Sequence, residues 1–113
     1  MIVETHIDPT GSLVLAVDRT DERLISIGFE GFEWHTHPDL LMGEYGPTAE
    51  MALEAFKHAL MGDELVIAII RRGSRMVDVS LPDEPLSEHE SLSEGETLER
   101  RYWSGRLWSQ HAM

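Results

Sequence analysis

Only one segment of this chain has the spacing of an amphipathic helix. Residues 49–61 place apolar side chains three and four positions apart, after a Pro-Thr pair and before a glycine. The apolar stripe consists of Ala52, Ala55, Phe56, Ala59 and Leu60. Because most of these side chains are small, we expect one main helix that packs closely on a face of a sheet.

The remaining apolar segments have the alternation or the short β-branched runs that are typical of strands. These segments are residues 2–7, 12–17, 23–29, 33–37, 65–71 and 75–81. The last two are separated by Arg72-Gly73-Ser74, which predicts a hairpin. The fold class expected is α+β, with an antiparallel sheet of five to six strands and one main helix packed on a face.

The length of the chain, 113 residues, suits one hydrophobic core and therefore a single domain over residues 1–113. Residues 82–96 carry Pro, Ser and Glu with few apolar anchors, and we expect an acidic mobile segment there. Residues 97–108 contain three large aromatic residues around Gly105, which predicts a C-terminal aromatic strand or hairpin.

The composition is strongly acidic. Asp and Glu number 21 against 9 Lys and Arg, so the formal net charge is −12. Nucleic-acid binding is not expected, because neutralising phosphates needs clustered cations. We also expect no membrane association and a cytoplasmic protein, because the sequence lacks a signal peptide and an apolar run of membrane-spanning length. Cysteine is absent, which excludes thiolate catalysis.

The acidic residues are concentrated in one stretch. Residues 76–99 hold eight acids and no Lys or Arg. One interpretation is a solvated loop. The other is a surface that steers a basic protein partner toward the domain.

A short motif carries the clearest chemical pattern. Glu33, His35 and His37 occupy every second position, so on a strand all three side chains share one face and are candidate zinc ligands. The alternative is that the histidines lie on a solvated face while Trp34 and Thr36 face the core. We therefore assign no cofactor and keep zinc as the candidate metal.

The segment His35-Thr36-His37-Pro38, followed by a loop, a Pro-Thr helix start and an apolar strand, resembles the middle of the JAMM/MPN metalloprotease family. That resemblance implies a zinc-dependent hydrolase in which His35 and His37 hold the metal. The family's Asp position falls on Thr48 and its Ser position on Tyr45.

Two carboxylates are candidates for the missing roles in this resemblance. Glu50 replaces the family's Asp only if the loop is longer by two residues, and Glu4 lies at a suitable upstream distance for the family's base. No other catalytic motif is present, so we assign no catalytic residue.

The sequence is also similar in general character to bacterial immunity proteins that neutralise polymorphic toxins, which implies a basic protein partner. We accordingly interpret the chain as an acidic protein-binding module of the inhibitor or immunity type, with a metal-binding protein or JAMM-like hydrolase as the alternative. The tryptophans are either partner anchors or core residues. The candidate partner-binding residues are Trp34, Glu44, Glu50, Glu54, Tyr102, Trp103 and Trp108. The sequence does not define an oligomeric state.

Overall fold

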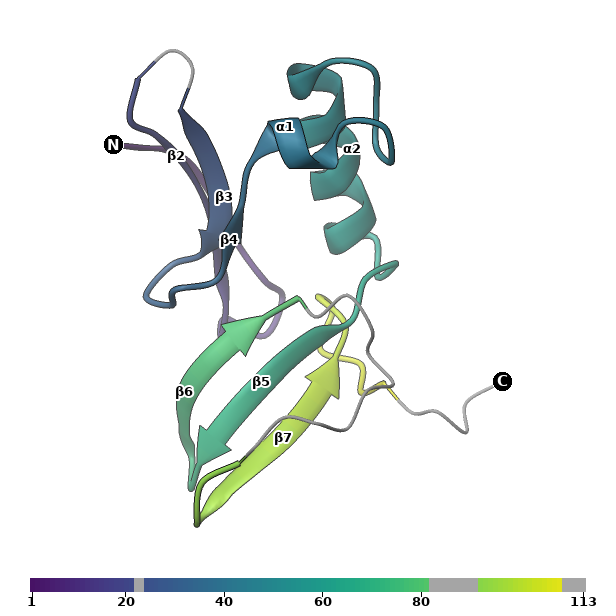
Figure 1. The fold of residues 1–113 in the computed structure, drawn as a ribbon. Helices are drawn as coiled ribbons and strands as arrows, with labels where there is room; N and C mark the ends of the chain where they lie inside the picture. Colours follow the sequence, from purple (N-terminus) through teal and green to yellow (C-terminus); the bar gives the residue numbers. More distant parts are fainter. Residues whose placement is uncertain (22–23, 82–91, 109–113) are drawn as a thin grey trace.

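The structure is a computed structural model that describes residues 1–21, 24–81 and 92–108 (Figure 1). The described elements are strands β1 (Ile2–Ile7), β2 (Val14–Arg19), β3 (Ile25–Phe29) and β4 (His35–Thr36), helices α1 (Pro38–Leu41) and α2 (Ala49–Met61), and strands β5 (Ile67–Arg72), β6 (Arg75–Ser80) and β7 (Glu96–Arg101). None of the helices in these ranges is long and apolar enough to cross a membrane.

The strands form two antiparallel sheets. The first has the order β1-β2-β3-β4 and the second the order β6-β5-β7. The α+β class agrees with the expectation from sequence, but the strands do not join in one sheet of five to six. The two helices are inserted between β4 and β5, and no β4–β5 pairing occurs among the described strands. Strand periodicity does not record which strands pair, so the sequence patterns could not show this division.

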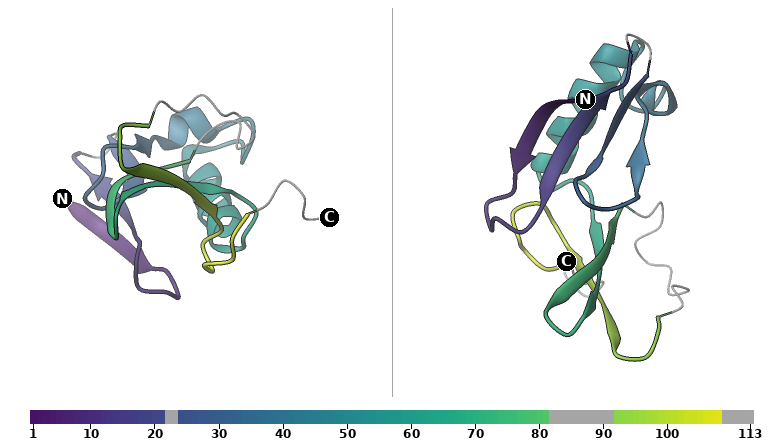
Figure 2. Two further views of the ribbon diagram at one scale, coloured as in Figure 1. Left: turned by 90° about the horizontal axis from the view of Figure 1, so that it is seen from below. Right: turned by 90° about the vertical axis from the view of Figure 1, so that its left-hand side faces the viewer.

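Helix α2 lies against one face of the first sheet, and the other face is open (Figures 1 and 2). Both sheets and α2 contribute to a single cluster of buried apolar side chains, which fixes the arrangement by burying apolar surface. The cluster consists of Leu13, Leu15, Val17, Ile27, Phe29, Leu41, Ala52, Phe56, Leu60, Ile67, Ile69, Val79 and Trp103.

The bounds of α2 are those expected from its sequence. The Oγ1 atom of Thr48 accepts a hydrogen bond from the backbone N–H of Met51 at 3.1 Å, which caps the first turn. Helix α1 lies in a stretch expected to be loop. It is a single turn that begins at Pro38, where the fixed φ of proline suits a helix start.

The C-terminal part of the described chain belongs to the core. Strand β7 pairs with β5 along its length, and an isolated bridge joins Arg101 to Leu107. Trp103 is only 5% exposed, so it packs inside the fold. Of the segment expected to be mobile, residues 82–91 lie outside the described residues.

A buried ion pair connects the two sheets. Asp8, in the turn after β1, accepts a hydrogen bond from Arg101 Nη2 at 2.5 Å. Burial raises the pKa of Asp8, but hydrogen bonds from the Leu13 N–H, from Thr10 and from Arg101 outweigh this and lower it to about 2. Asp8 is therefore a carboxylate in the folded protein at neutral pH.

A second buried cation connects α2 to the first sheet. The ammonium of Lys57 lies 2.6 Å from Glu4 on β1 and 2.7 Å from Glu54 on α2. Glu4 also accepts from His6 at 2.5 Å. Burial lowers the pKa of Lys57, but the two carboxylates raise it more, so the amine stays charged.

Candidate functional site

The two histidines of the His-Thr-His motif lie side by side. In β4, His35 pairs with Gly28 and Thr36 pairs with Ile27 of β3. The ring centroids of His35 and His37 are 5.1 Å apart, with the ring planes nearly perpendicular at 86°. Thr36 lines a pocket on the core side, whereas Trp34 lines both this pocket and the open face beside His35.

Hydrogen bonds to the backbone orient both rings. The Nδ1 atom of His35 lies 2.9 Å from the Glu33 carbonyl oxygen, and that of His37 lies 2.9 Å from the Ile25 carbonyl oxygen. A carbonyl only accepts, so in each neutral ring Nδ1 donates the hydrogen and Nε2 keeps its lone pair. Carbonyl partners of this kind orient metal-bound histidines in general.

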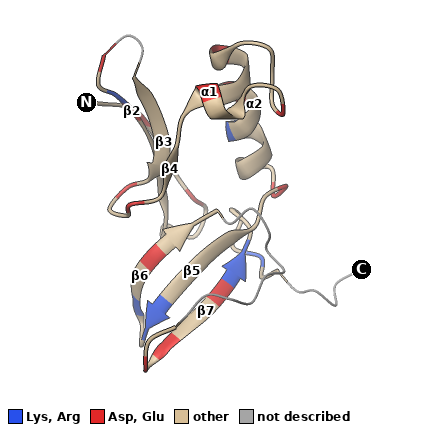
Figure 3. Cartoon of the chain, viewed as in Figure 1, with Lys and Arg blue, Asp and Glu red and all other residues tan. Residues whose placement is uncertain are grey.

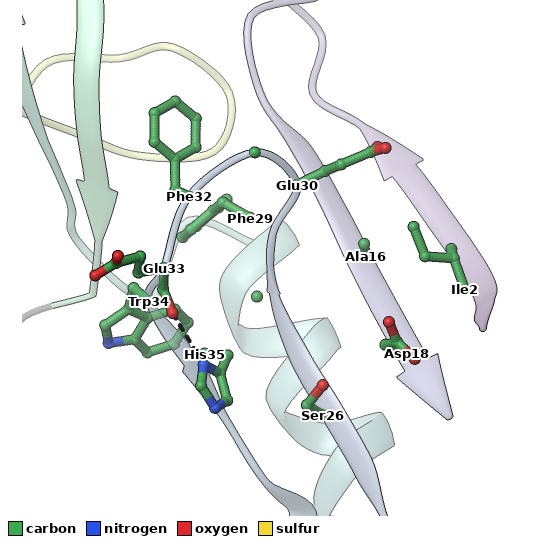
Figure 4. A pocket seen from close by; sticks show the side chains of 12 residues that line it. Ile2, Ala16, Asp18, Ser26, Phe29, Glu30, Phe32, Glu33, Trp34 and His35 are labelled. Carbon is green, nitrogen blue, oxygen red and sulfur yellow. Dashed lines mark hydrogen bonds between the residues drawn. The ribbon is translucent and has the colours of Figure 1, made fainter. Parts of the chain in front are cut away.

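A third metal ligand does not join the two rings. Glu33 contacts His35 through its backbone carbonyl, and its carboxylate points away from the ring (Figure 4). Within the described ranges, no group of three or more His, Asp and Glu side chains is placed to hold a metal ion. The site expected from Glu33, His35 and His37 is thus reduced to a pair of imidazoles.

The other positions implied by the metalloprotease resemblance also do not meet at the histidines. Thr48 caps α2, and Tyr45 packs edge-on against Phe56 with ring centroids 5.5 Å apart. Glu4 binds Lys57 of α2, whereas its strand neighbour Thr5 pairs with Ala16, which faces the open side of the sheet. Glu4 therefore lies on the helix side of the sheet.

The open face of the first sheet is hollowed beside His35. We call this the outer hollow; its volume is about 310 Å³. It is lined by Ile2, Ala16, Asp18, Ser26, Gly28, Phe29, Glu30, Gly31, Phe32, Glu33, Trp34 and His35, as Figure 4 shows. No Lys or Arg is among these residues. The N-terminal amine of the chain lies 2.9 Å from the Asp18 carboxylate at its edge.

Gly28 determines how closely β3 and β4 approach beside this hollow. A Cβ atom at position 28 would collide with the carbonyl oxygen of Trp34 and lie 3.0 Å from the Cβ of His35. Only glycine fits between these atoms, so this residue sets the position of His35 relative to the sheet.

A larger pocket, with a volume of about 490 Å³, lies on the core side of the first sheet near α1, α2 and the start of β5. We call it the aromatic pocket. It is lined by Trp34, Thr36, Leu40, Leu41, Glu44, Tyr45, Phe56, Glu64, Leu65, Val66 and Leu81. The pKa of Tyr45 is raised by burial and then by the charges of Glu44 and Glu64, so both carboxylates act on the phenol.

The residues expected to bind a partner are spread over the molecule. Trp34 and Glu44 line the aromatic pocket, and Glu50 is exposed in the first turn of α2. Glu54 binds Lys57. The other three candidates, Tyr102, Trp103 and Trp108, follow β7 and lie apart from the aromatic pocket.

Cation–π contacts occupy two of those C-terminal aromatics. The guanidinium of Arg106 lies 4.2 Å from the ring centre of Tyr102, and that of Arg100 lies 5.5 Å from that of Trp108. Trp103, expected as a candidate anchor, is buried in the core because the turn after β7 folds it inward.

Sequence patterns did not indicate the aromatic pocket. Tyr45 stands in a loop, Phe56 reads as helix core, and Glu64 follows the helix, so no periodicity connects them. The available signal was an aromatic residue in a loop that also carries Glu44.

Comparisons with known proteins do not indicate a function for this chain. A scan against protein-family models found no match, and searches of curated proteins and of solved structures returned no similar chain.

Proposed function

We propose that this protein is an acidic protein-binding module of the inhibitor or immunity type, which blocks a basic partner such as a toxin. The observation that carries the proposal is the charge balance. Even if every Lys and Arg neutralised one carboxylate, a net charge of −12 would remain. A surface with this excess attracts a basic protein over a distance and disfavours acidic ones.

Among the described residues, the acidic excess lies on the first sheet and the helices. Residues 1–21 and 24–70 hold twelve Asp and Glu against two cations, Arg19 at the end of β2 and Lys57, which is buried between two carboxylates. The arginines of β5 and β7 lie on the second sheet, where Arg71 and Arg72 pair with Glu99 and Glu96 (Figure 3). The first sheet and the helices therefore offer a predominantly negative surface.

An inhibitor built in this way acts by covering its target. Carboxylates align with the cations of a substrate-binding surface and speed the encounter, while apolar contacts slow dissociation. Exposed apolar side chains close to the acidic residues include Leu40, at 74% exposure, and Met51, at 56%. They supply contacts that charge alone does not provide.

The test screens the purified chain against basic proteins encoded beside its gene for association and inhibition. We expect it to inhibit one of them at equimolar ratio, with an association rate that falls at least tenfold between about 50 and 500 mM salt, because the screening length shortens to a few ångström. Glu30→Lys and Glu33→Lys, each alone, should slow association, and Glu94→Lys near the second sheet, with the same charge change, serves as the matched control. An association rate independent of salt contradicts the proposal.

The second candidate function is metal binding by His35 and His37. It is supported by the two Nε2 lone pairs that the backbone hydrogen bonds leave available. Two imidazoles without a third protein ligand should bind zinc no more tightly than micromolar. Zinc titration of the native chain, of His35→Ala and of the control His58→Ala tests this, and stoichiometric zinc retained against a chelator would show a stronger site.

A further inference from the structure

We propose that the aromatic pocket binds an organic cation with an apolar body, that is, an alkylammonium or a guanidinium group. The inference rests on the proposed function only for the source of that cation, which we assign to a Lys or Arg side chain of the basic partner. The binding chemistry itself follows from the walls and charges of the pocket.

The size and walls of the pocket suit a small organic group. Its volume of about 490 Å³ lies in the range of about 300–1,000 Å³ that is usual for small-molecule sites. Three aromatic rings line it, from Trp34 just before β4, Tyr45 on the loop after α1 and Phe56 on α2. Tyr45 and Phe56 meet edge to face with centroids 5.5 Å apart, so two walls form a corner.

The charges of the pocket select for a cation. The exposed carboxylates of Glu44 and Glu64 are its two ionised side chains, and no Lys, Arg or His is among its described lining residues. An anion entering it would meet uncompensated negative charge. A cation is attracted by the carboxylates and by the faces of the aromatic rings.

The two carboxylates act at one point. Burial and then the charges of Glu44 and Glu64 raise the pKa of Tyr45, so the negative potential of both side chains converges on its hydroxyl group. Because the phenol lines the pocket, a cation bound there would face this potential directly. Tyr45 therefore also reports occupancy, since a bound cation would lower its pKa.

The outer hollow is a weaker candidate for the same chemistry. Its edge carboxylate, Asp18, already holds the N-terminal amine at 2.9 Å. It is also smaller, at about 310 Å³. The aromatic pocket has no such internal cation among its described lining residues.

The first experiment uses the full chain and two nearly isosteric probes, phenethylamine as the cation and 2-phenylethanol as the neutral control. Binding is followed through the indole N–H resonance of Trp34 and the pH titration of Tyr45. We expect the amine to bind about tenfold more tightly than the alcohol and to lower the Tyr45 pKa. Equal affinities, or no shift of the Trp34 resonance with either probe, would overturn the inference.

Matched variants separate the pocket from the general charge of the protein. Glu44→Gln with Glu64→Gln should weaken amine binding about tenfold, whereas Glu50→Gln with Glu94→Gln removes the same charge elsewhere and should leave it nearly unchanged. An equal loss in both double variants contradicts a specific site. Retained melting temperatures in both double variants exclude unfolding as the cause.

Further probes identify the source of the cation. Acetyl-arginine amide and acetyl-lysine amide present the side chain of a protein, and agmatine and butylamine present the same cationic groups without a peptide backbone. Binding of the blocked residues supports a partner side chain, while binding of the free amines alone overturns that assignment. If no probe binds but association with the basic partner still depends on salt, the pocket inference fails and the proposed function stands.

Discussion

The carboxylate of Asp8 and the guanidinium of Arg101 lie 2.5 Å apart in the interior, although 93 positions separate them in the chain. Arg101 also donates to the carbonyl oxygens of Tyr102 and Trp103, at 2.8 and 2.7 Å. The pair joins the β1–β2 turn of one sheet to the end of the other. It thereby connects the two sheets beside Leu13 and Trp103 of the apolar core.

Removing the cation of this pair should be strongly destabilising. Arg101→Met leaves the Asp8 carboxylate buried without its partner, and we expect a loss of about 3–5 kcal/mol in the free energy of unfolding. The matched control is Arg72→Met, which breaks an ion pair of 3.3 Å in which Arg72 is 61% exposed. That change should cost less than about 1 kcal/mol. Urea denaturation of both variants measures the difference, and equal losses would show that the buried pair has no special role.

Acid should weaken the fold through Asp8. Its pKa is about 2 when folded and 3.8 in the reference state, so the stabilisation is present above about pH 4 and is lost as the pH falls toward 2. The shift corresponds to about 2 kcal/mol. Asp8→Asn should be less stable at neutral pH and should lose less stability between pH 4 and 2.5. If the free energy of unfolding depends on pH in the same way for the original protein and for Asp8→Asn, this prediction is wrong.

A methyl group at position 28 should push β4 away from β3. Gly28→Ala places Cβ against the Trp34 carbonyl, which we expect to cost about 1–3 kcal/mol and to displace His35. Ser26→Ala, on the same strand and the same hollow, should stay within about 0.5 kcal/mol of the original. Thermal denaturation and the imidazole resonances of His35 and His37 test both effects.

Lys57 should resist amine-reactive reagents in the native state. It is the only lysine in the sequence, its side chain is 6% exposed, and the carboxylates of Glu4 and Glu54 keep it protonated. The N-terminal amine, on Met1 whose side chain is 87% exposed, is the internal control. Peptide mass spectrometry after labelling should find the modification of Lys57 only in denaturant. Rapid native labelling would show that the network opens readily.

Much of the local structure could be predicted from the sequence, because local periodicity reports local geometry. The bounds of α2 and β1 and the shared face of His35 and His37 follow from spacing alone. The division into two sheets could not be predicted, because it depends on pairings between distant strands. The same holds for the site: the histidines were visible in the sequence, whereas the aromatic pocket is assembled from loop, helix and strand positions that share no pattern.

The separation of Asp8 from Arg101 also has a consequence for biosynthesis. At a translation rate of about 5–20 residues per second, the 93 intervening positions take roughly 5–20 s to be added. During that interval β1 to β3 can pair while the turn between β1 and β2 carries a carboxylate without its cation. The ion pair that connects the two sheets therefore forms only after β7 has been synthesised.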